Sequence, residues 1–260
     1  MLAEHGDDVK VLAGGQSLVP MLALRLARFD HLVDVNRVTE LSQVARAVDA
    51  IVVGATVRQR LMERDPDVRA SVPLLARATP LIGHFQIRNR GTVGGSLAHA
   101  DPASEYPAVA LALGATFEVA STRGRRRVDA RDFFVGTWTT SMEPDELLVS
   151  ITFPTAAGGF AIEEVARRHG DFALAGAVCA LHDGRAAVAL FGVGSMAVRA
   201  PDAEVAAAAG APAREIAELA VRDLDPPNDV HASSATRRRI ARHVVERAVT
   251  RAREELGAAG

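Results

Sequence analysis

The chain has 260 residues, 48% of them hydrophobic and 24% charged, which suffices for one large domain or two smaller ones with a buried core. Its net charge of −2 gives no global attraction to nucleic acid or to membrane surfaces. No apolar run is long enough to span a bilayer, and the first residues lack signal-peptide character. Cys179 is the only cysteine, which excludes an internal disulfide and an iron–sulfur cluster held by this chain alone. We expect a cytoplasmic protein that is not integral to a membrane and does not bind nucleic acid.

The first half of the chain alternates short strands with short helices. A buried strand over 9–13 precedes a glycine break, after which apolar residues at helical spacing predict a helix over 18–27. The stretch 82–96 is poor in periodicity and rich in glycine and polar residues. The other elements expected here are strands over 31–35, 50–54, 115–120, 126–128 and 147–153, a helix beginning within 56–62, and helices over 73–80 and 104–113.

Residues 154–159, Pro-Thr-Ala-Ala-Gly-Gly, have the composition of a linker and divide the chain into domains at 1–155 and 160–260. Beyond the linker, a strand is expected over 160–168. A hairpin of strands over 173–182 and 185–193 is expected around Asp183-Gly184, a pair typical of a type I′ turn. Helices over 202–222 and 234–256 follow. Strands followed by helices indicate an α+β arrangement.

Two glycine pairs carry the most informative chemistry. They lie in Ala13-Gly14-Gly15-Gln16-Ser17 and Thr92-Val93-Gly94-Gly95-Ser96. Paired glycines let the backbone approach a ligand closely, and successive N–H groups can form a concave anion site. One such loop alone is more often a plain tight turn, but two of the same design fit a ligand with two adjacent phosphates. Neither loop has the lysine of a nucleoside triphosphate loop, so the sequence favours a pyrophosphate that is held, as in FAD.

Three other motifs are weaker indications of a functional site. Gly192-Val193-Gly194-Ser195-Met196-Ala197 formally matches a dinucleotide fingerprint, but the expected hairpin and Pro201 favour a structural turn. Ser96, His99 and Asp101 are too close in sequence for a catalytic triad, so a loop-stabilising role or a cofactor contact is expected instead. The arginine runs at 123–127 and 237–239 are interpreted as solvated surfaces, with docking of a partner as the alternative for the first run.

The sequence resembles the FAD-binding medium subunit of molybdenum hydroxylases, the carbon monoxide dehydrogenase and xanthine dehydrogenase family. The resemblance follows nearly the whole chain in order and is most specific in its long central motif. The segments that carry it are Ala13 to Leu18 with Leu24-Arg25-Leu26, Ile82-Gly83-His84, Gln86 to Pro102, Arg167 to Ala173, and Asp229 to Ser233. The family has a further extended stretch and a first helix before the position of Met1, so we expect the first lobe to lack that helix. Thr236 replaces a usual tyrosine, and Met196-Ala197 a more polar turn, both outside the phosphate loops.

The resemblance implies a two-part α+β fold. A bilobed FAD-binding domain of the p-cresol methylhydroxylase type precedes a C-terminal domain of the carbon monoxide dehydrogenase flavoprotein type, with an antiparallel sheet plus helices. It also implies that both glycine motifs hold the FAD pyrophosphate, with apolar residues along the cofactor, acidic residues near its polar parts, and one aromatic residue at the isoalloxazine ring. The expected FAD-binding residues are Val11, Leu12, Ala13, Gly14, Gly15, Gln16, Ser17, Leu18, Ile82, Thr92, Val93, Gly94, Gly95, Ser96, Asp101, Glu105, Leu148 and Phe172.

Three functions remain open from the sequence. The favoured one is an electron-transfer subunit that holds FAD and has no catalytic side chain or metal of its own. Its partners would be a large molybdopterin subunit and a small subunit with [2Fe–2S] clusters, in a dimer of heterotrimers. The alternatives are a self-contained flavin oxidoreductase and a scaffold subunit without flavin. The molybdenum subunit selects the substrate in this family, so carbon monoxide, a purine, an aldehyde and an N-heterocycle all stay open.

Overall fold

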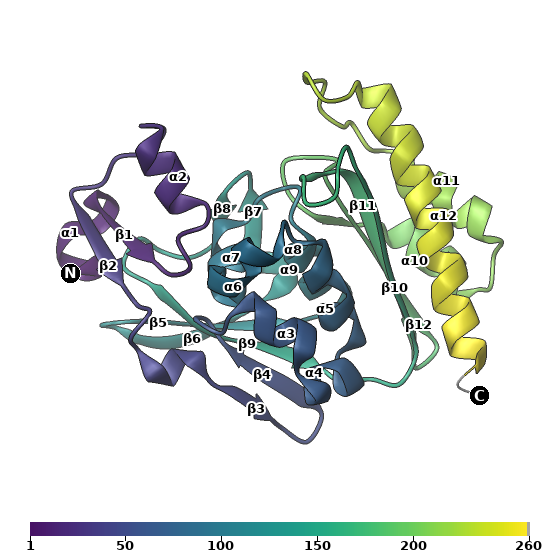
Figure 1. Cartoon of the computed structure of the whole chain (residues 1–260). Coiled ribbons are helices and arrows are strands. Elements are labelled where there is room, and N and C mark those ends of the chain that lie inside the picture. The colour runs from purple at the N-terminus through teal and green to yellow at the C-terminus, as the bar shows by residue number, and fades with distance from the viewer. Residues whose placement is uncertain (259–260) are drawn as a thin grey trace.

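The structure is a computed structural model that describes residues 1–258, which form layers of helices and sheets (Figure 1). The strands are β1 Val9–Leu12, β2 His31–Asp34, β3 Val44–Arg46, β4 Ala50–Gly54, β5 Thr116–Ser121, β6 Gly124–Asp129, β7 Phe134–Gly136, β8 Thr139–Thr140, β9 Leu147–Pro154, β10 Gly159–Ala166, β11 Ala173–His182, β12 Arg185–Phe191 and β13 Val198–Arg199. The helices are α1 Leu2–His5, α2 Leu18–Ala23, α3 Gln59–Arg64, α4 Pro66–Ser71, α5 Pro73–Ala78, α6 Phe85–Arg90, α7 Val93–His99, α8 Glu105–Leu113, α9 Ala130–Phe133, α10 Pro201–Ala208, α11 Ala213–Val221 and α12 Ser234–Ala258. The 3₁₀ turns are η1 Gly6–Asp8, η2 Thr39–Ser42 and η3 Thr79–Leu81.

The strands form separate sheets along the chain. Strands β1 and β2 pair in parallel. Together with helices α1 and α2 they form a small N-terminal lobe (Figure 1). A larger antiparallel sheet has the order β3-β4-β9-β5-β6, and β7 pairs with β8. The C-terminal antiparallel sheet has the order β10-β11-β12-β13. This mixture of helices with mostly antiparallel sheets confirms the expected α+β class.

Helices fill the space between the two large sheets. Helix α8 contacts β9 on one side and β11 and β12 on the other, while α12 covers the outer face of β10 and β11 (Figure 1). Strand β11 is therefore buried on both faces, and its run of small residues lets helices approach from each side. Gly176 shows how tight this packing is, because a Cβ there would lie 2.1 Å from Cζ of Phe191. One buried cluster includes residues from both large sheets, so the two parts of the chain share a core.

Most expected elements appear near their expected places. The hairpin at Asp183-Gly184 is confirmed, since both residues have positive φ, 52° and 70°, as a type I′ turn requires. The fingerprint-like segment after β12 leads into the short antiparallel strand β13 rather than a helix, which confirms the structural-turn interpretation. The stretch 82–96, for which the sequence showed little periodicity, contains α6 and the start of α7.

Two expected helices have wrong bounds. The helix expected over 18–27 ends at Ala23, because Arg25 adopts a left-handed conformation and the exposed Leu24 and Leu26 bury nothing that would extend it. The helix expected over 202–222 is two helices, α10 and α11. They are separated where Gly210 has φ of 80° and Pro212 caps the second helix.

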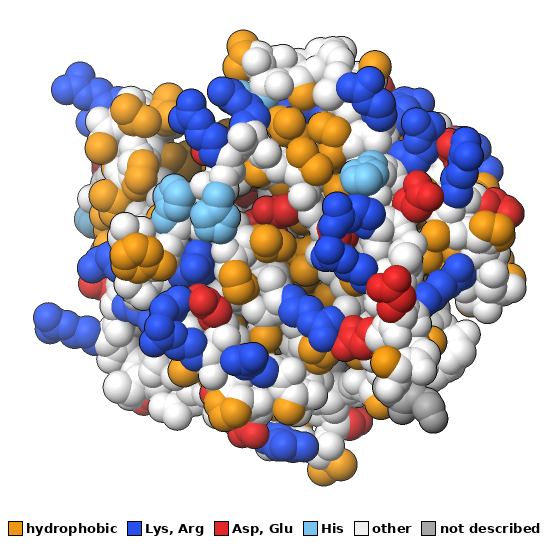
Figure 2. Space-filling view, turned by 45° about the vertical axis from the view of Figure 1, so that its right-hand side comes forward, with side chains coloured by type: hydrophobic (Ala, Val, Ile, Leu, Met, Phe, Trp, Pro, Cys, Tyr) orange, Lys and Arg blue, Asp and Glu red, His pale blue; other side chains and the backbone are white. Residues whose placement is uncertain are grey.

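The run at 123–127 is exposed, as expected, and three of its arginines form surface ion pairs. Arg123, Arg125 and Arg126 pair with Asp145, Glu118 and Glu146, respectively. Figure 2 likewise shows basic side chains dispersed over the face in view, with acidic ones between them. Arg237 is buried, contrary to expectation, because its guanidinium donates to the carbonyls of Leu174 and Gly192 and pairs with Asp229.

Candidate functional site: a cofactor site at two glycine motifs

The first glycine motif is a true loop at the carboxyl end of β1. It leads into α2, and the chain then returns as the parallel strand β2. Gly15 has φ of 73°, a conformation that favours glycine. Within residues 1–258, the backbone N–H groups of 14–17 donate no hydrogen bond. Carboxyl ends of parallel strands with free amide donors are a common place for phosphate groups.

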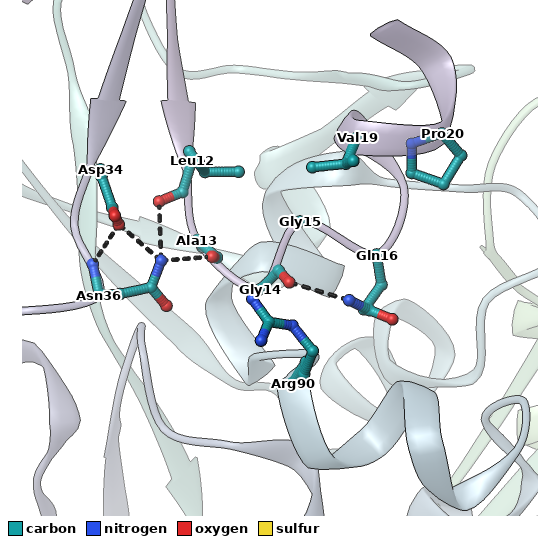
Figure 3. A pocket seen from close by; sticks show the side chains of 10 residues that line it. All are labelled: Leu12, Ala13, Gly14, Gly15, Gln16, Val19, Pro20, Asp34, Asn36 and Arg90. Carbon is teal, nitrogen blue, oxygen red and sulfur yellow. Dashed lines mark hydrogen bonds between the residues drawn. The ribbon is translucent and has the colours of Figure 1, made fainter. Parts of the chain in front are cut away.

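A cavity of about 320 Å³ opens at this loop (Figure 3). Asn36, just after β2, organises one side of the cavity. Its Nδ2 donates to the carbonyl of Ala13 at 2.7 Å and to Oδ1 of Asp34 at 2.6 Å. The carbonyl group of Ala13, at the start of the loop, therefore points toward Asn36. The lining residues are Leu12, Ala13, Gly14, Gly15, Gln16, Val19, Pro20, Asp34, Asn36 and Arg90.

The second glycine motif has a different structure, which corrects the expectation of two similar loops. Thr92 is the N-cap of α7, and its Oγ1 accepts a hydrogen bond from the N–H of Gly95 at 3.0 Å. The N–H groups of Val93 and Gly94 donate to the carbonyls of Val57 and Ala55, and that of Ser96 donates to the Thr92 carbonyl. The amides of this helical turn are therefore already bonded within the protein.

The fold brings the two motifs side by side, although about 80 residues separate them in sequence. A Cβ on Gly14 would lie 2.5 Å from the carbonyl oxygen of Arg90, and one on Gly95 would lie 3.4 Å from Cβ of Ala13. The first loop thus packs directly against the segment that starts α7. Thirteen of the expected FAD-binding residues, 11–18 and 92–96, lie in these two adjoining segments.

Asp101 lies between α7 and α8 and is engaged by its neighbours. Its Oδ1 accepts from the N–H of Ala103, and its Oδ2 accepts from the indole Nε1 of Trp138 at 3.1 Å. Trp138 has φ of 52°, an unfavourable backbone conformation for a bulky residue, yet its side chain is 58% exposed. Its ring also lies parallel to that of His99. Asp101 therefore stabilises this loop through Trp138, a contact that the sequence did not indicate.

Glu105, the first residue of α8, is only 6% exposed. Burial, together with the neighbouring carboxylate of Glu164, raises the pKa of Glu105 to about 8. Burial also raises the pKa of Glu164 to about 7. Glu105 therefore carries a proton in much of the population at neutral pH and can donate a hydrogen bond.

The remaining expected residues lie at some distance along the chain from the motifs. Ile82 precedes a turn that the buried Arg88 fixes by donating to the carbonyls of Ile82 and Gly83. The turn that holds Phe172 reaches the same region, because a Cβ on Gly170 would lie 2.6 Å from Cε1 of His84. The side chain of Phe172 is 68% exposed. Leu148 is buried in the shared core on β9, a strand that α7 contacts.

Besides Val19, Pro20 and Asp34, which also line the cavity, three linked side chains at this site were not among the expected residues. They are Asn36, Arg58 and Arg90, which are linked because Arg58 donates to the Arg90 carbonyl and to Oδ1 of Asn36 at 2.9 Å. Arg90 belongs to the central motif and could have been suspected from its closeness in sequence to Gly94. Asn36 and Arg58 gave no local signal, because only the tertiary fold places them beside the first loop.

The free donors, the cavity and the nearby cations fit a dinucleotide with a pyrophosphate, which indicates the class of dinucleotide-binding proteins. Comparison with known proteins narrows the class. Residues 1–156 match the family model described as the FAD binding domain in molybdopterin dehydrogenase. The chain therefore belongs to the family of FAD-binding subunits of molybdopterin dehydrogenases, and its cofactor is FAD.

Similar proteins agree with this assignment. The chain is 39% identical to the 6-hydroxypseudooxynicotine dehydrogenase complex subunit alpha of Paenarthrobacter nicotinovorans, over 97% of this chain and 89% of that one. It is 38% identical to the caffeine dehydrogenase subunit beta of Pseudomonas sp. strain CBB1, over 98% and 91%. A carbon monoxide dehydrogenase structure from Hydrogenophaga pseudoflava superposes with a TM-score of 0.93 at 36% identity, over 98% of this chain and 93% of that one.

These relatives are oxidoreductase subunits, and several are named as medium chains of larger enzymes. The chain is accordingly an oxidoreductase subunit with the fold of the carbon monoxide dehydrogenase medium subunit. Among residues 1–258, no helix combines the length and hydrophobicity needed to cross a membrane.

Proposed function

We propose that this chain is the electron-transfer subunit of a molybdopterin, iron–sulfur and flavin hydroxylase or dehydrogenase. The observation that carries the proposal is the first glycine loop, whose free amides adjoin the start of α7 in a chain of this family. When bound, FAD supplies the redox chemistry, and the protein supplies binding, orientation and electrostatics. Electrons would arrive from [2Fe–2S] clusters on a small partner and leave to an external acceptor.

Different residues of this chain would contact different parts of FAD. The amides of Gly14 to Ser17 would bind phosphate, while Thr92 to Ser96 would fix the position of the first loop. Glu105 would hold a proton near the polar parts of the cofactor, and Asp101 would act there through the loop that it stabilises. Ile82, Leu148 and Phe172 would make its apolar contacts.

The partners are part of the same proposal. A large molybdopterin subunit would oxidise the substrate, and the three subunits would form a dimer of heterotrimers. We propose domains at 1–155 and 160–260, which share the core described above. A cytoplasmic location is in keeping with the lone buried Cys179.

The test begins with the purified chain freed of flavin and titrated with FAD. We expect quenching of flavin fluorescence that saturates at one FAD per chain, and flavin absorption bands that survive gel filtration. Co-expression with a large and a small subunit from neighbouring reading frames should yield a complex containing molybdenum, iron and FAD. A chain that shows no flavin absorption bands after reconstitution would overturn the proposal.

The alternatives give different results. A self-contained flavin oxidoreductase would turn over a small substrate with a nicotinamide donor in the absence of any partner. A flavin-free scaffold would join the complex equally well after substitution of Gly15. The free amides of the first loop favour a ligand-binding chain over the scaffold, because four successive donors without a protein partner suit an anion.

A further inference from the structure

Two neighbouring arginines lie near the first glycine loop, and one of them, Arg90, lines the cavity. Arg90 is the last residue of α6 and lines the cavity next to Gly14 (Figure 3). Arg58 lies next to it, and burial and the positive charge of Arg90 both lower the pKa of Arg58. The carboxylate of Asp34, which also lines the cavity, partly compensates the positive charges of the two arginines. Arg90 and Asp34 line the cavity and balance each other, and Arg58, which bonds to the lining residues Arg90 and Asn36 from behind, adds a net positive charge to the site.

The two arginines have different hydrogen bonds. Arg58 uses its planar fork to join two backbone segments, since Nη1 donates to the Arg90 carbonyl and Nη2 to Oδ1 of Asn36. Asn36 in turn donates to the carbonyl of Ala13 in the first loop. Within residues 1–258, the guanidinium of Arg90 forms no hydrogen bond or ion pair of its own. A charged group with five donors is thus left available beside the free amides of the loop.

From this arrangement we propose that Arg90 supplies the positive charge for a phosphate of FAD at the first glycine loop, and that Arg58 is its positioning residue. The proposal rests on FAD binding by this chain, as proposed above. Keeping two like charges close costs free energy in the unliganded protein, and an anion between them and the loop amides removes that cost. Arg58 would act indirectly, by holding the Arg90 backbone and, through Asn36, the first loop in register.

The test uses the full chain freed of flavin, with FAD as the titrant and ADP as a competitor that has the diphosphate without the flavin. Arg90→Ala should weaken binding of both FAD and ADP at least about tenfold, as expected for loss of a charge-assisted hydrogen bond. The salt dependence of FAD affinity should also become flatter, because one screened charge interaction is gone. Arg90→Lys keeps the charge and should restore most of both effects.

Replacement of Arg58 by lysine should not preserve FAD affinity, unlike replacement of Arg90 by lysine. Arg58→Lys cannot reach both acceptors with one ammonium group, so it should lose as much FAD affinity as Arg58→Ala. The salt dependence should stay near the wild-type slope in both Arg58 variants, since Arg90 still meets the phosphate. Arg185→Ala, an exposed arginine on β12, is the control and should leave FAD affinity unchanged.

Melting temperatures separate binding from folding. If Arg90→Ala proves unstable, Arg90→Gln keeps most of the side chain and carries the same test. An Arg90 variant that folds and binds FAD and ADP with wild-type affinity and wild-type salt dependence overturns the inference but leaves the proposed function intact. A wild-type chain that binds no FAD would instead defeat the proposed function itself.

Discussion

The two glycine motifs have nearly the same residues but different local structures. The first is a loop with free amides, and the second is a capped helical turn whose amides are bonded to Thr92, Ala55 and Val57. A Cβ on Gly94 would lie 2.5 Å from Cβ of Ala55, so this glycine permits packing within the protein. The difference teaches that a glycine pair can serve either a ligand or the fold, and that only the partners of its N–H groups decide which.

The surroundings of the two motifs also differ in charge. Arg58 and Arg90 lie beside the first loop, whereas a buried carboxyl group, that of Glu105, lies beyond the second motif. A hydroxyl contact of 3.3 Å between Ser96 and Ser104 connects the second motif to the residue before Glu105. The first loop thus favours an anion, while the buried carboxyl group beyond the second motif holds a proton.

The largest expected effect is that of Gly94→Ala. The new methyl group would overlap both Cβ and the carbonyl oxygen of Ala55, so we expect the free energy of unfolding to fall by about 3 kcal/mol. Urea denaturation of the flavin-free chain measures this change. Gly136→Ala is the control, because a Cβ at Gly136 has no neighbour within 4 Å. If Gly94→Ala were as stable as the control but bound no FAD, the assignment of Gly94 to packing would be wrong.

The second prediction concerns the pH dependence of stability. The folded chain keeps a proton on Glu105 up to about pH 8, while the unfolded chain loses it at the ordinary carboxyl pKa. Folding therefore takes up a proton between these values, and the free energy of unfolding should fall as pH rises, by up to about 1.4 kcal/mol per pH unit. Denaturation at several pH values should show a flatter slope for Glu105→Gln.

Three charged groups near Glu105 bear on this result. Glu164 and Asp101 raise its pKa, and Arg88 lowers it. Glu164→Gln should also reduce the slope, because it removes the raised pKa of Glu164 itself and lowers the pKa of Glu105. The exposed Glu215 is the control, and its replacement by glutamine should leave the slope unchanged. A wild-type slope retained in Glu105→Gln would contradict the assignment of the buried proton.

The third prediction concerns the first loop. Gly15 and Gly184 both have a positive φ, 73° and 70°, so alanine should cost about 1 kcal/mol of stability at Gly184 and somewhat more at Gly15, where a Cβ would lie 3.1 Å from Cγ2 of Val19. Only Gly15→Ala should also weaken FAD binding, because only that residue adjoins the free amides. Thermal melts and fluorescence titrations of both variants make the comparison. Equal FAD affinity in the two variants would show that the first loop does not hold the cofactor.

Local chemistry made the first loop and the hairpin predictable from sequence. Glycine after a short strand, and Asp183-Gly184 between two strands, each act over a few residues, although β1 proved to be only partly buried. The structure of the second motif was not predictable, because α7 begins where it does through hydrogen bonds to Ala55 and Val57, which are distant in sequence. The side chain of Arg237 was misjudged for the same reason, since its acceptors at 174 and 192 come together only in the folded C-terminal sheet.

The smallest expected effect comes from the cap of α7. Thr92→Ala removes the acceptor for the N–H of Gly95 and should lower the free energy of unfolding by about 1 kcal/mol, whereas Thr92→Ser keeps the acceptor and should cost less. The loss should be the same with and without saturating FAD, because the bonded amide takes no part in binding. If FAD instead restored the stability of Thr92→Ala, the freed N–H of Gly95 would have found a phosphate. The second motif would then be able to bind a phosphate as the first does. In the wild-type chain, only the hydrogen bond from the N–H of Gly95 to Oγ1 of Thr92 would prevent this.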